Sequence, residues 1–451
     1  MARKRVGAGA RVSDLSVGID GYNLAMPHGT GVATYGFALT ETLRAMGRQT
    51  LGVFGVPVGM RPELREILFY EAMVREATPS KLPAPLRYAA QRIGGYRTAR
   101  GHEVPDTGLV ERRYFRSRLP RFDRIVSAAN LFERADRHFA RTWRFTRLVV
   151  PDPPAVMHWT YPVPIRLEGA RNVYTLHDLV PLKLPYATLD RKRSYYRLVE
   201  RCVREGDHIC TVSESSRRDI ADLFAVDPDR ITNTYQTAPS LPQGFDRTRV
   251  DADVASLFGL KPRGYLLYFG AIEPKKNVAR MVEAHLSSQL DMPLVLVGAR
   301  AWQSEGDLQL VTSGLAASGS AFGRRVADRV VRLDYLPRSL LLQLVSGARA
   351  VVFPSLYEGF GLPVLEAMQL GTPVLTANTG SLPEVAGNAA ALVDPYDTRA
   401  IADAMVRLGR DDAWCAELAR RGFAQAANFT PDRYRERLDG MYDAVLRRPR
   451  R

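Results

Sequence analysis

The residues best suited to chemistry are two glutamates separated by seven positions, Glu358 and Glu366. Glu358 follows an apolar run that ends at Pro354, and a Gly-Phe-Gly turn at 359–361 leads into a predicted helix that carries Glu366. Ligands of open α/β sheets bind outside the carboxyl ends of the strands, and the unpaired N–H groups of a helix N-terminus suit a phosphate. Taken alone, the spacing fits a ligand site and an ordinary unit with two solvated glutamates equally well.

The whole run from residue 354 to 384 (PSLYEGFGLPVLEAMQLGTPVLTANTGSLPE) resembles the donor-site signature of retaining sugar-nucleotide glycosyltransferases of family 4. The resemblance implies the GT-B fold, which is α/β with two Rossmann-like doubly wound domains and a cleft between them. It also implies that Glu358 is catalytic and binds the donor sugar near the reacting carbon, and that Glu366 accepts hydrogen bonds from the ribose hydroxyls. The remaining residues that the signature implies in substrate binding are Gly359, Phe360, Gly361 and Leu362.

A second part of the resemblance follows the strand predicted at Tyr265–Gly270. In the family, a lysine beside an asparagine or glycine binds the donor diphosphate, and Lys276, which precedes Asn277, matches that lysine. Many members also have an arginine directly after the glycine, where this chain has Ala271. We therefore expect Lys275 to supply the phosphate contact that the arginine would make.

Two further candidates lie in the first half of the chain. His177 and Asp178 follow a strand predicted at Asn172–Leu176, at the end where ligands bind. The family has a histidine in this position that faces the donor sugar, so the resemblance implies this role for His177, while Asp178 orients the loop or contacts the substrate. Gly29 and Gly31 lie in the loop after the first strand, where glycines let the backbone approach a ligand closely. The loop lacks the G-x-G-x-x-G pattern of an NAD site.

Positioning these residues requires two sets of alternating strands and helices. In the first half we predict strands at Leu15–Asp20, Thr50–Gly55, Val156–Trp159, Asn172–Leu176, Ile209–Val212 and Ile231–Tyr235. In the second half we predict strands at Tyr265–Gly270, Pro293–Gly298, Val330–Leu333, Val351–Phe353, Thr372–Thr376 and Ala390–Val393. The expected organisation is an acceptor-side domain at 1–240, a nucleotide-sugar domain at 241–430 and a last helix at 431–451 that packs back on the first domain, with a linker near 236–262.

The composition indicates the cellular compartment and the broad class of protein. A chain of 451 residues is too long for one core, and 46% apolar with 25% charged residues is typical of a globular protein. Three cysteines without metal-ligand spacing favour a reducing cytoplasm over a disulfide framework. The basic N-terminus is followed by no apolar region, so we expect no signal peptide. No run approaches the roughly 18 apolar residues of a membrane span.

The net charge of +15 is concentrated in one segment. Residues 61–145 are predicted to form several basic helices with a loop at 94–107, and between 112 and 124 arginines alternate with aromatic and apolar residues. Such a surface can lie on an anionic membrane, or it can be a solvated arginine-rich face. No nucleic-acid motif is present in the sequence, so we expect no nucleic-acid partner.

The resemblance implies transfer of a sugar with retention at the anomeric carbon. No D-x-D metal motif is convincing in this sequence, so we predict metal-independent transfer and no cofactor besides a nucleotide-diphosphate sugar as donor substrate. Fixed positive charge at the leaving diphosphate is then the largest help available to the reaction. The suggested route is front-face, with the leaving phosphate taking the acceptor proton.

The signature most resembles bacterial mannosyltransferase-like members, which build O-antigen, capsule or exopolysaccharide. We therefore expect GDP-mannose as donor, a glycan or lipid-linked oligosaccharide as acceptor, and a cytoplasmic enzyme in peripheral contact with the anionic inner membrane. Two alternatives stay open at this point. One is a sugar-nucleotide epimerase or a phosphorylase of the same fold. The other is a non-catalytic protein that binds sugar nucleotides.

Overall fold

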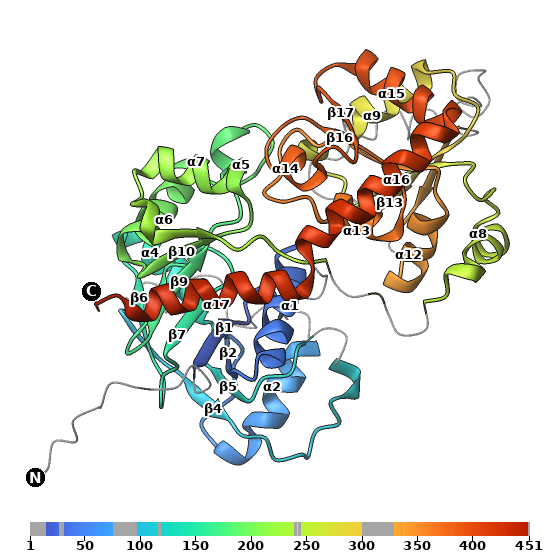
Figure 1. Ribbon diagram of the computed structural model, residues 1–451. Helices are drawn as coiled ribbons and strands as arrows, with labels where there is room; N and C mark the ends of the chain where they lie inside the picture. Colours follow the sequence, from blue (N-terminus) through green and yellow to red (C-terminus); the bar gives the residue numbers. More distant parts are fainter. Residues whose placement is uncertain are drawn as a thin grey trace, which may run out of the picture.

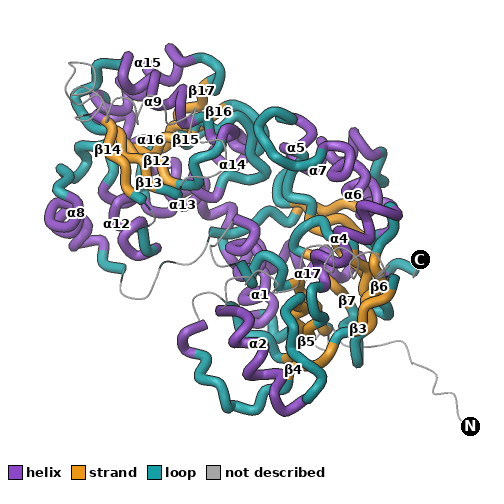
Figure 2. The backbone as a smooth tube through the Cα atoms, turned by 180° about the vertical axis from the view of Figure 1, so that it is seen from behind, coloured by secondary structure: helices purple, strands orange, loops and turns teal. Residues whose placement is uncertain are grey.

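The chain folds into two open α/β sheets that lie in separate lobes (Figure 1). Seen from behind, the strands again form two groups, each covered by helices (Figure 2). This confirms the expected GT-B class of fold. The computed structural model describes residues 15–26, 31–74, 97–115, 119–238, 241, 245–299, 329–334 and 336–449.

The N-terminal lobe contains an eight-stranded sheet. In spatial order its strands are β11 (Ile231–Asn233), β10 (His208–Thr211), β9 (Arg171–Thr175), β7 (Val156–Trp159), β1 (Ser16–Asp20), β2 (Gln49–Phe54), β5 (Arg124–Ser127) and β4 (His102–Val104). All of its pairings are parallel except that of β4 with β5. Strands β7, β9 and β10 are buried at every residue, as parallel strands covered on both faces should be.

Helices and a small sheet surround these strands. The helices of this lobe are α1 (Gly31–Ala45), α2 (Arg65–Val74), α4 (Leu131–Thr142), α5 (Val180–Lys183), α6 (Lys192–Glu205) and α7 (Glu214–Phe224). The small parallel sheet consists of β3 (Thr98–Arg100), β6 (Thr146–Val149) and β8 (Ile165–Leu167). Ser213 caps α7, because its side chain accepts a hydrogen bond from the Ser216 N–H at 3.0 Å.

The C-terminal lobe contains a six-stranded parallel sheet. Its strands, in spatial order, are β14 (Val330–Leu333), β13 (Leu294–Val297), β12 (Leu266–Phe269), β15 (Ala350–Phe353), β16 (Val374–Ala377) and β17 (Ala391–Val393). Its helices are α8 (Val250–Phe258), α9 (Val278–Ser287), α12 (Arg338–Gly347), α13 (Leu362–Leu370), α14 (Leu382–Ala386), α15 (Thr398–Arg410) and α16 (Asp412–Ala426). Strands β12, β13 and β15 are buried throughout and form the centre of its core.

Each sheet has one pair of neighbouring strands from which the later strands are added on opposite sides. In the N-terminal sheet the chain proceeds from β1 to β2 and β5 on one side and from β7 to β9, β10 and β11 on the other. In the C-terminal sheet it proceeds from β12 to β13 and β14, and then from β15 to β16 and β17. The carboxyl ends of the pairs β1/β7 and β12/β15 are therefore the topological switch points, where ligands bind in this class of sheet.

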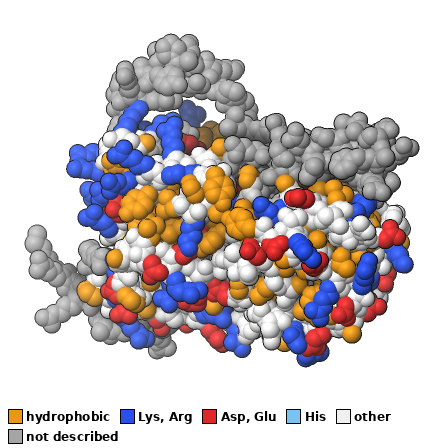
Figure 3. Space-filling model, turned by 90° about the horizontal axis from the view of Figure 1, so that it is seen from above, with side chains coloured by type: hydrophobic (Ala, Val, Ile, Leu, Met, Phe, Trp, Pro, Cys, Tyr) orange, Lys and Arg blue, Asp and Glu red, His pale blue; other side chains and the backbone are white. Residues whose placement is uncertain are grey.

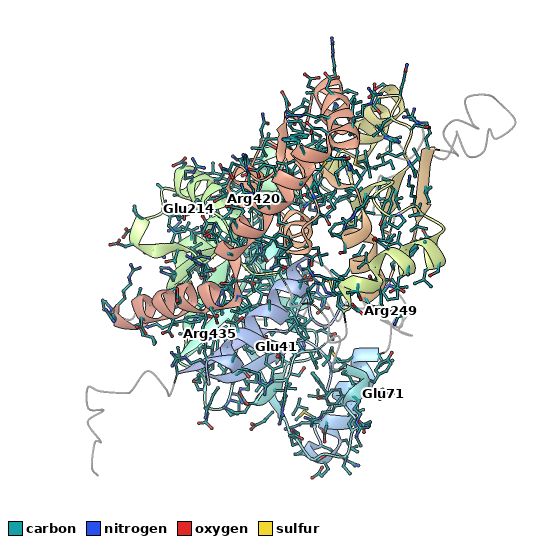
Figure 4. The ribbon with its side chains drawn as sticks, turned by 45° about the vertical axis from the view of Figure 1, so that its right-hand side comes forward. Glu41, Glu71, Glu214, Arg249, Arg420 and Arg435 are labelled. Carbon is teal, nitrogen blue, oxygen red and sulfur yellow. The ribbon has the colours of Figure 1, made fainter. Side chains whose placement is uncertain are left out.

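The last helix, α17 (Pro431–Arg447), runs from the C-terminal lobe across the N-terminal one (Figure 1). Thr430 caps it, and Pro431 stands in its first turn, where proline is favoured. Tyr442 lies 2.6 Å from His158 Nδ1 of β7, and Asp439 accepts a hydrogen bond from Arg48 at 2.6 Å. Glu41 and Arg435 mark the two helices α1 and α17 where they contact each other (Figure 4).

The prediction for residues 61–145 is wrong in part. Besides α2 and α4, the segment contains β5 in the main sheet and β3 and β4 where a loop was expected. These strands have only three or four residues and carry arginines or other polar residues. They therefore have too few apolar residues to show the alternating apolar and polar pattern by which a strand is predicted. Their place is set by pairing with β2 and β6 rather than by local pattern.

The expected lipid-facing surface of this segment is also wrong in part, because its apolar members Phe115, Leu119 and Phe122 are buried in the core. Arg112 pairs with Glu66 and with Asp106, the latter at 2.6 Å. Arg116 and Arg118 lie outside the described residues.

The linker predicted near 236–262 is likewise shorter than expected, since α8 lies within it. Val250 and Val254, one helical turn apart, are buried on the face that packs against α12. The predicted domain boundaries at 240 and 430 stay predictions.

Candidate active site

The loop between β15 and α13 presents a row of backbone donors at the β12/β15 switch point. In the described part of the chain, we find no acceptor for the N–H groups of Gly359, Phe360, Gly361 and Leu362. Gly361 has φ +110°, a conformation that residues with a side chain rarely adopt, and α13 begins directly after it. The loop therefore offers the donors and the helix N-terminus that a phosphate requires.

Glu358 stands in this loop and forms an ion pair with Lys276. Lys276 Nζ lies 2.6 Å from Glu358 Oε1, and the side chains are only 14% and 9% exposed. Burial alone would raise the pKa of the Glu358 carboxyl, but the charges of Lys276 and Lys275 lower it below its ordinary value. Glu358 is therefore ionised at neutral pH. Lys276 follows β12, so the switch point brings together two residues 82 positions apart.

Lys275 provides a second positive charge in the cleft. Burial alone would lower the pKa of its amine, but the carboxylates of Glu358, Asp178 and Glu273 raise it above its ordinary value. Of these carboxylates, that of Glu273 forms an ion pair with Lys275, at 3.6 Å from Lys275 Nζ. Lys275 also lines a cavity between the lobes, together with His177 and Asp178. Both lysines therefore act on Glu358, and Lys275 also lies against the loops of the N-terminal lobe.

His177 and Asp178 follow β9 and lie directly opposite the Glu358 loop. A Cβ added to Gly359 would lie 2.5 Å from the carbonyl oxygen of His177, so only glycine fits between the lobes here. Ser216 of α7 joins the two loops, because its Oγ lies 2.7 Å from the His177 carbonyl and 3.4 Å from that of Gly359. The structure therefore places the predicted residues of both halves in one site.

The imidazole of His177 is held in one orientation. Its Nε2 donates to the carbonyl of Thr160 at 2.8 Å, which leaves Nδ1 as an acceptor. Burial lowers the pKa of the ring, so His177 is neutral. Asp178 Oδ1 accepts from the Val180 N–H at 2.9 Å, and its carbonyl accepts from the Tyr195 hydroxyl at 2.9 Å. Asp178 therefore orders the loop, which was one of the two roles expected for it.

Glu366 lies in α13 and is 9% exposed. Its partner is Arg338 of α12, which donates to Glu366 Oε1 at 2.8 Å. The two glutamates of the signature thus have separate cations, Lys276 for Glu358 and Arg338 for Glu366. These pairings fix the direction in which each carboxylate points.

The glycine loop after β1 is described only in part. Gly29 lies outside the described residues, whereas Gly31 begins α1. A Cβ at Gly31 would have no neighbour within 4 Å, so the packing does not require glycine there. The predicted role of both residues in substrate binding stays a prediction.

A cavity of about 530 Å³, which we name the inner cavity, opens beside His177 and Lys275. Loops of the N-terminal lobe form most of its wall, and Glu273 and Lys275 of the C-terminal lobe complete it. Among the residues that the structure describes, no group of three or more His, Cys, Asp or Glu side chains could hold a metal ion. The site as built can grip an anion with backbone donors and two lysines while a second molecule lies against His177.

Comparisons with known proteins agree with this geometry. The family described as "Glycosyl transferases group 1" matches residues 258–425, and "Glycosyltransferase Family 4" matches residues 95–235. O-antigen chain mannosyltransferase B of Escherichia coli is 35% identical over 274 residues, 59% of this chain and 68% of that protein. This chain belongs to the group 1, family 4 glycosyltransferases. The serotype-specific mannosyltransferase WbdA of Escherichia coli is 30% identical over 60% of the chain, which spans 33% of that longer protein.

Solved structures show the same fold for the glycosyltransferase. HepE of Anabaena, solved in complex with UDP and glucose, has a TM-score of 0.60 at 14% identity, over 95% of this chain and 99% of that one. WaaG, described as a glycosyltransferase involved in lipopolysaccharide biosynthesis, has a TM-score of 0.55 at 15% identity, over 94% of this chain and 98% of that one. In the described part of the glycosyltransferase, no helix has the length and apolar character needed to cross a membrane.

Sequence reasoning missed several residues that build the site of this glycosyltransferase. Arg338 was not among the predicted site residues, yet it pairs with Glu366. Ser381 supports the Glu358 loop, since its Oγ lies 2.9 Å from the Glu358 carbonyl and 2.8 Å from that of Phe360. Glu384 reaches the other lobe and accepts from the Glu214 and Ser215 N–H groups, both at 2.9 Å. Ser381 and Glu384 lie within the matched signature, which was the signal available for them.

Proposed function

We propose that this glycosyltransferase is a retaining, metal-independent mannosyltransferase that transfers mannose from GDP-mannose to a glycan. The observation that carries the donor part is the Lys276–Glu358 pair beside the free N–H groups of residues 359–362. Two relatives, an O-antigen chain mannosyltransferase and a serotype-specific mannosyltransferase, support the choice of sugar. We infer from them an acceptor in the synthesis of bacterial surface polysaccharide.

In the reaction we propose, the leaving diphosphate lies against the N–H groups at the start of α13 and against the two lysines. The acceptor oxygen forms a bond to the anomeric carbon on the face from which the diphosphate leaves. The bond between that carbon and the phosphate oxygen breaks, and the hydroxyl proton of the acceptor passes to the departing phosphate oxygen. Preorganised donors stabilise the charge that develops on the diphosphate, and this contribution is the largest in many enzymes.

Glu358 and His177 hold the sugar rather than attack it in this scheme. The carboxylate of Glu358 is fixed by Lys276 and accepts hydrogen bonds from sugar hydroxyls. Nδ1 of His177 accepts from the sugar on the opposite side, because Nε2 is bound to Thr160. Glu366 and Arg338, at the far side of α13, hold the ribose.

The test is transfer from GDP-mannose to a mannose-terminated oligosaccharide in the presence of EDTA, followed by NMR of the product. We expect an α-linked mannose, with the configuration of the donor, and full activity in EDTA. A β-linked product would overturn retention, and loss of activity in EDTA that magnesium restores would overturn metal independence. If GDP-mannose were not consumed while another sugar nucleotide was, the assignment of the donor would fall.

We also propose peripheral contact with an anionic membrane, through α6 rather than through the segment first expected. Lys and Arg side chains gather on the N-terminal side of the molecule, next to an apolar area (Figure 3). Arg191, Arg193 and Arg204 are exposed on or beside α6, and Tyr186 and Leu189 before it are 64% and 67% exposed. Basic residues beside exposed apolar ones suit an anionic lipid surface.

Flotation with vesicles tests this contact. We expect binding to vesicles that contain phosphatidylglycerol and weaker binding after Arg193→Glu. The matched control is Arg399→Glu, whose side chain is 92% exposed in the other lobe and which should bind as the unchanged protein does. Equal flotation with neutral and anionic vesicles at low salt would contradict the proposal.

A further inference from the structure

A second cavity adjoins the inner one on the side away from the C-terminal lobe. This outer cavity has a volume of about 310 Å³. The two cavities share the residues Tyr161, Pro162, Asp190 and Tyr195 as a common wall. The inner cavity reaches Lys275, whereas the outer one extends to α4. The two cavities therefore adjoin each other, with the inner one beside the candidate reaction site and the outer one within the N-terminal lobe.

The outer cavity lies at the switch point of the N-terminal sheet. Tyr22 follows β1, and residues 161–164 follow β7. These two strands are parallel neighbours, but the strands that come after β1 lie on one side of the pair and those after β7 lie on the other. Each sheet of this protein thus has a crevice where ligands bind. The crevice of the C-terminal sheet is the one that holds the donor in our proposal. The crevice of the N-terminal sheet is left for the other substrate.

The lining of the outer cavity suits a sugar ring. Tyr22 and Phe132 lie with their ring centroids 4.9 Å apart, and Tyr161 and Tyr195 add two more aromatic side chains. Aromatic side chains combine a flat apolar body with a polar tip, and a small number of polar groups among apolar ones is typical of ligand sites. The C–H faces of a sugar can pack on these rings.

Polar groups that can recognise sugar hydroxyls are also present. Asp136 of α4 and Asp190 line the outer cavity and are exposed to it, with Arg191 as the one cation among its lining residues. In the described part of the chain, no hydrogen-bond partner is found for the hydroxyls of Tyr22 and Tyr161. Burial raises the pKa of both phenols, so they stay protonated and can donate.

We propose that the outer cavity binds the second sugar unit of the acceptor glycan while the terminal, sugar-accepting unit lies in the inner cavity. The proposal rests on the proposed function and adds to it the size and charge of the acceptor. The protein prefers an acceptor of at least two sugar units to a single one. Because two carboxylates line the outer cavity against one arginine, the second unit is a neutral sugar, and an acidic group on it is disfavoured.

Binding is measured by NMR titration of the protein saturated with GDP, with methyl α-mannoside, an α-linked methyl mannobioside and the same mannobioside phosphorylated on its second sugar. We expect the mannobioside to bind at least about tenfold more tightly than the single sugar, the effect of one hydrogen bond to a charged group. The phosphorylated mannobioside should lose most of that gain. Equal affinity for the single sugar and the mannobioside would overturn the proposal.

Variants identify the cavity that is responsible. Asp136→Asn and Tyr22→Phe should each lower the ratio of the mannobioside affinity to the single-sugar affinity by about three- to tenfold, since each removes one polar contact. The control is Asp222→Asn, an exposed carboxylate of α7 in the same lobe that does not line the cavity, and its ratio should equal that of the unchanged protein. An unchanged ratio in Asp136→Asn and Tyr22→Phe together would place the second sugar elsewhere.

Consumption of GDP-mannose, measured on the same protein preparations without added GDP, separates the two proposals. If donor is consumed and the single sugar and the mannobioside bind equally, the outer cavity is not an acceptor site, while the proposed function stands. If no GDP-mannose is consumed but the mannobioside binds more tightly through Asp136 and Tyr22, the proposed donor is wrong and the glycan site stands.

Discussion

At the scale of single residues, the ion pair of Lys276 and Glu358 sets the charge of the cleft. Lys276→Met removes the hydrogen-bonded cation from a carboxylate that is 9% exposed. We expect kcat/KM to fall by about 100-fold or more, the range measured when one electrostatic donor is removed from an active site. The pH–rate profile checks this and should also show the acidic limb at higher pH, because the pKa of Glu358 rises when Lys276 no longer lowers it.

Lys261→Met is the control for this prediction, since Lys261 is an exposed lysine of the same lobe outside the cleft. It should leave the rate and the acidic limb unchanged. If Lys276→Met transferred sugar at the rate of Lys261→Met, the ion pair would have no role in the reaction.

Glu366 gives a second prediction at this scale. The carboxylate is paired with Arg338 and is expected to hold the ribose, so Glu366→Ala removes a charged hydrogen-bond partner. We expect donor binding to weaken by about 1–3 kcal/mol, measured by calorimetric titration with GDP-mannose. Glu283→Ala on the exposed face of α9 is the control. Unchanged donor affinity in Glu366→Ala would remove this residue from the site.

Which site residues could be found from sequence depended on whether their role is local. The glutamates, glycines and lysines lie in two short motifs, so spacing and resemblance were enough to select them. Arg338 and Glu366 are 28 positions apart and lie on different helices. Their pairing is set by how α12 packs beside α13. Nothing in the local sequence of Arg338 indicates that partner.

At the scale of elements, the start of α7 is a point where the two lobes contact each other. Glu384 of α14 accepts hydrogen bonds from the Glu214 and Ser215 N–H groups, and a carboxylate is favoured at a helix N-terminus. Figure 4 marks the position of Glu214 at this end of α7. The contact therefore belongs to both lobes, although α7 has its own cap in Ser213.

Glu384→Ala should lower Tm by about 2–4 °C for each kcal/mol that these two bonds contribute, which is the scale for a domain of this size. Differential scanning calorimetry measures the shift. Glu63→Ala, an exposed glutamate that precedes α2, should leave Tm unchanged. A Tm for Glu384→Ala equal to that of Glu63→Ala would show that the contact between the lobes contributes no stability.

The elements that the sequence predicted well are the buried strands of the sheet centres. Strands β12, β13 and β15 are four-residue apolar runs that end at a glycine or a proline, and such runs leave few alternatives. Strand β5 and helix α8 were missed for opposite reasons. β5 begins with an arginine inside a basic segment, and α8 lies in a region whose prolines and glycines dominated the local pattern, although Val250 and Val254 had helical spacing.

At the scale of the whole molecule, α17 ties the C-terminal lobe to the N-terminal sheet through a buried histidine. His158 of β7 lies between Tyr442 of α17 and Thr175 of β9, at 2.6 and 2.7 Å. Burial lowers its pKa from 6.5 to about 3, so the ring is neutral in the folded protein. His208 and His285 have their pKa lowered to about 4 by the same cause.

This gives a prediction of acid sensitivity with a definite sign. Below about pH 6.5 the unfolded chain takes up a proton at His158, whereas the folded protein does not until about pH 3. The free energy of unfolding should therefore fall as the pH decreases from 6.5 towards 3. Urea unfolding midpoints between pH 7 and 4 measure this. His158→Gln should show a shallower decrease, and a slope equal to that of the unchanged protein would contradict the account.

The whole arrangement makes one claim about where the donor lies, between the lobes and against the start of α13. The most direct test is a crystal structure of the protein with GDP-mannose. We predict diphosphate oxygens at hydrogen-bond distance, about 2.7–3.2 Å, from Lys276 Nζ and from backbone N–H groups of residues 359–362, with the mannose between Glu358 and His177. A nucleotide bound elsewhere, with Glu358 still paired only to Lys276 and the N–H groups of the loop without an anion, would contradict the account.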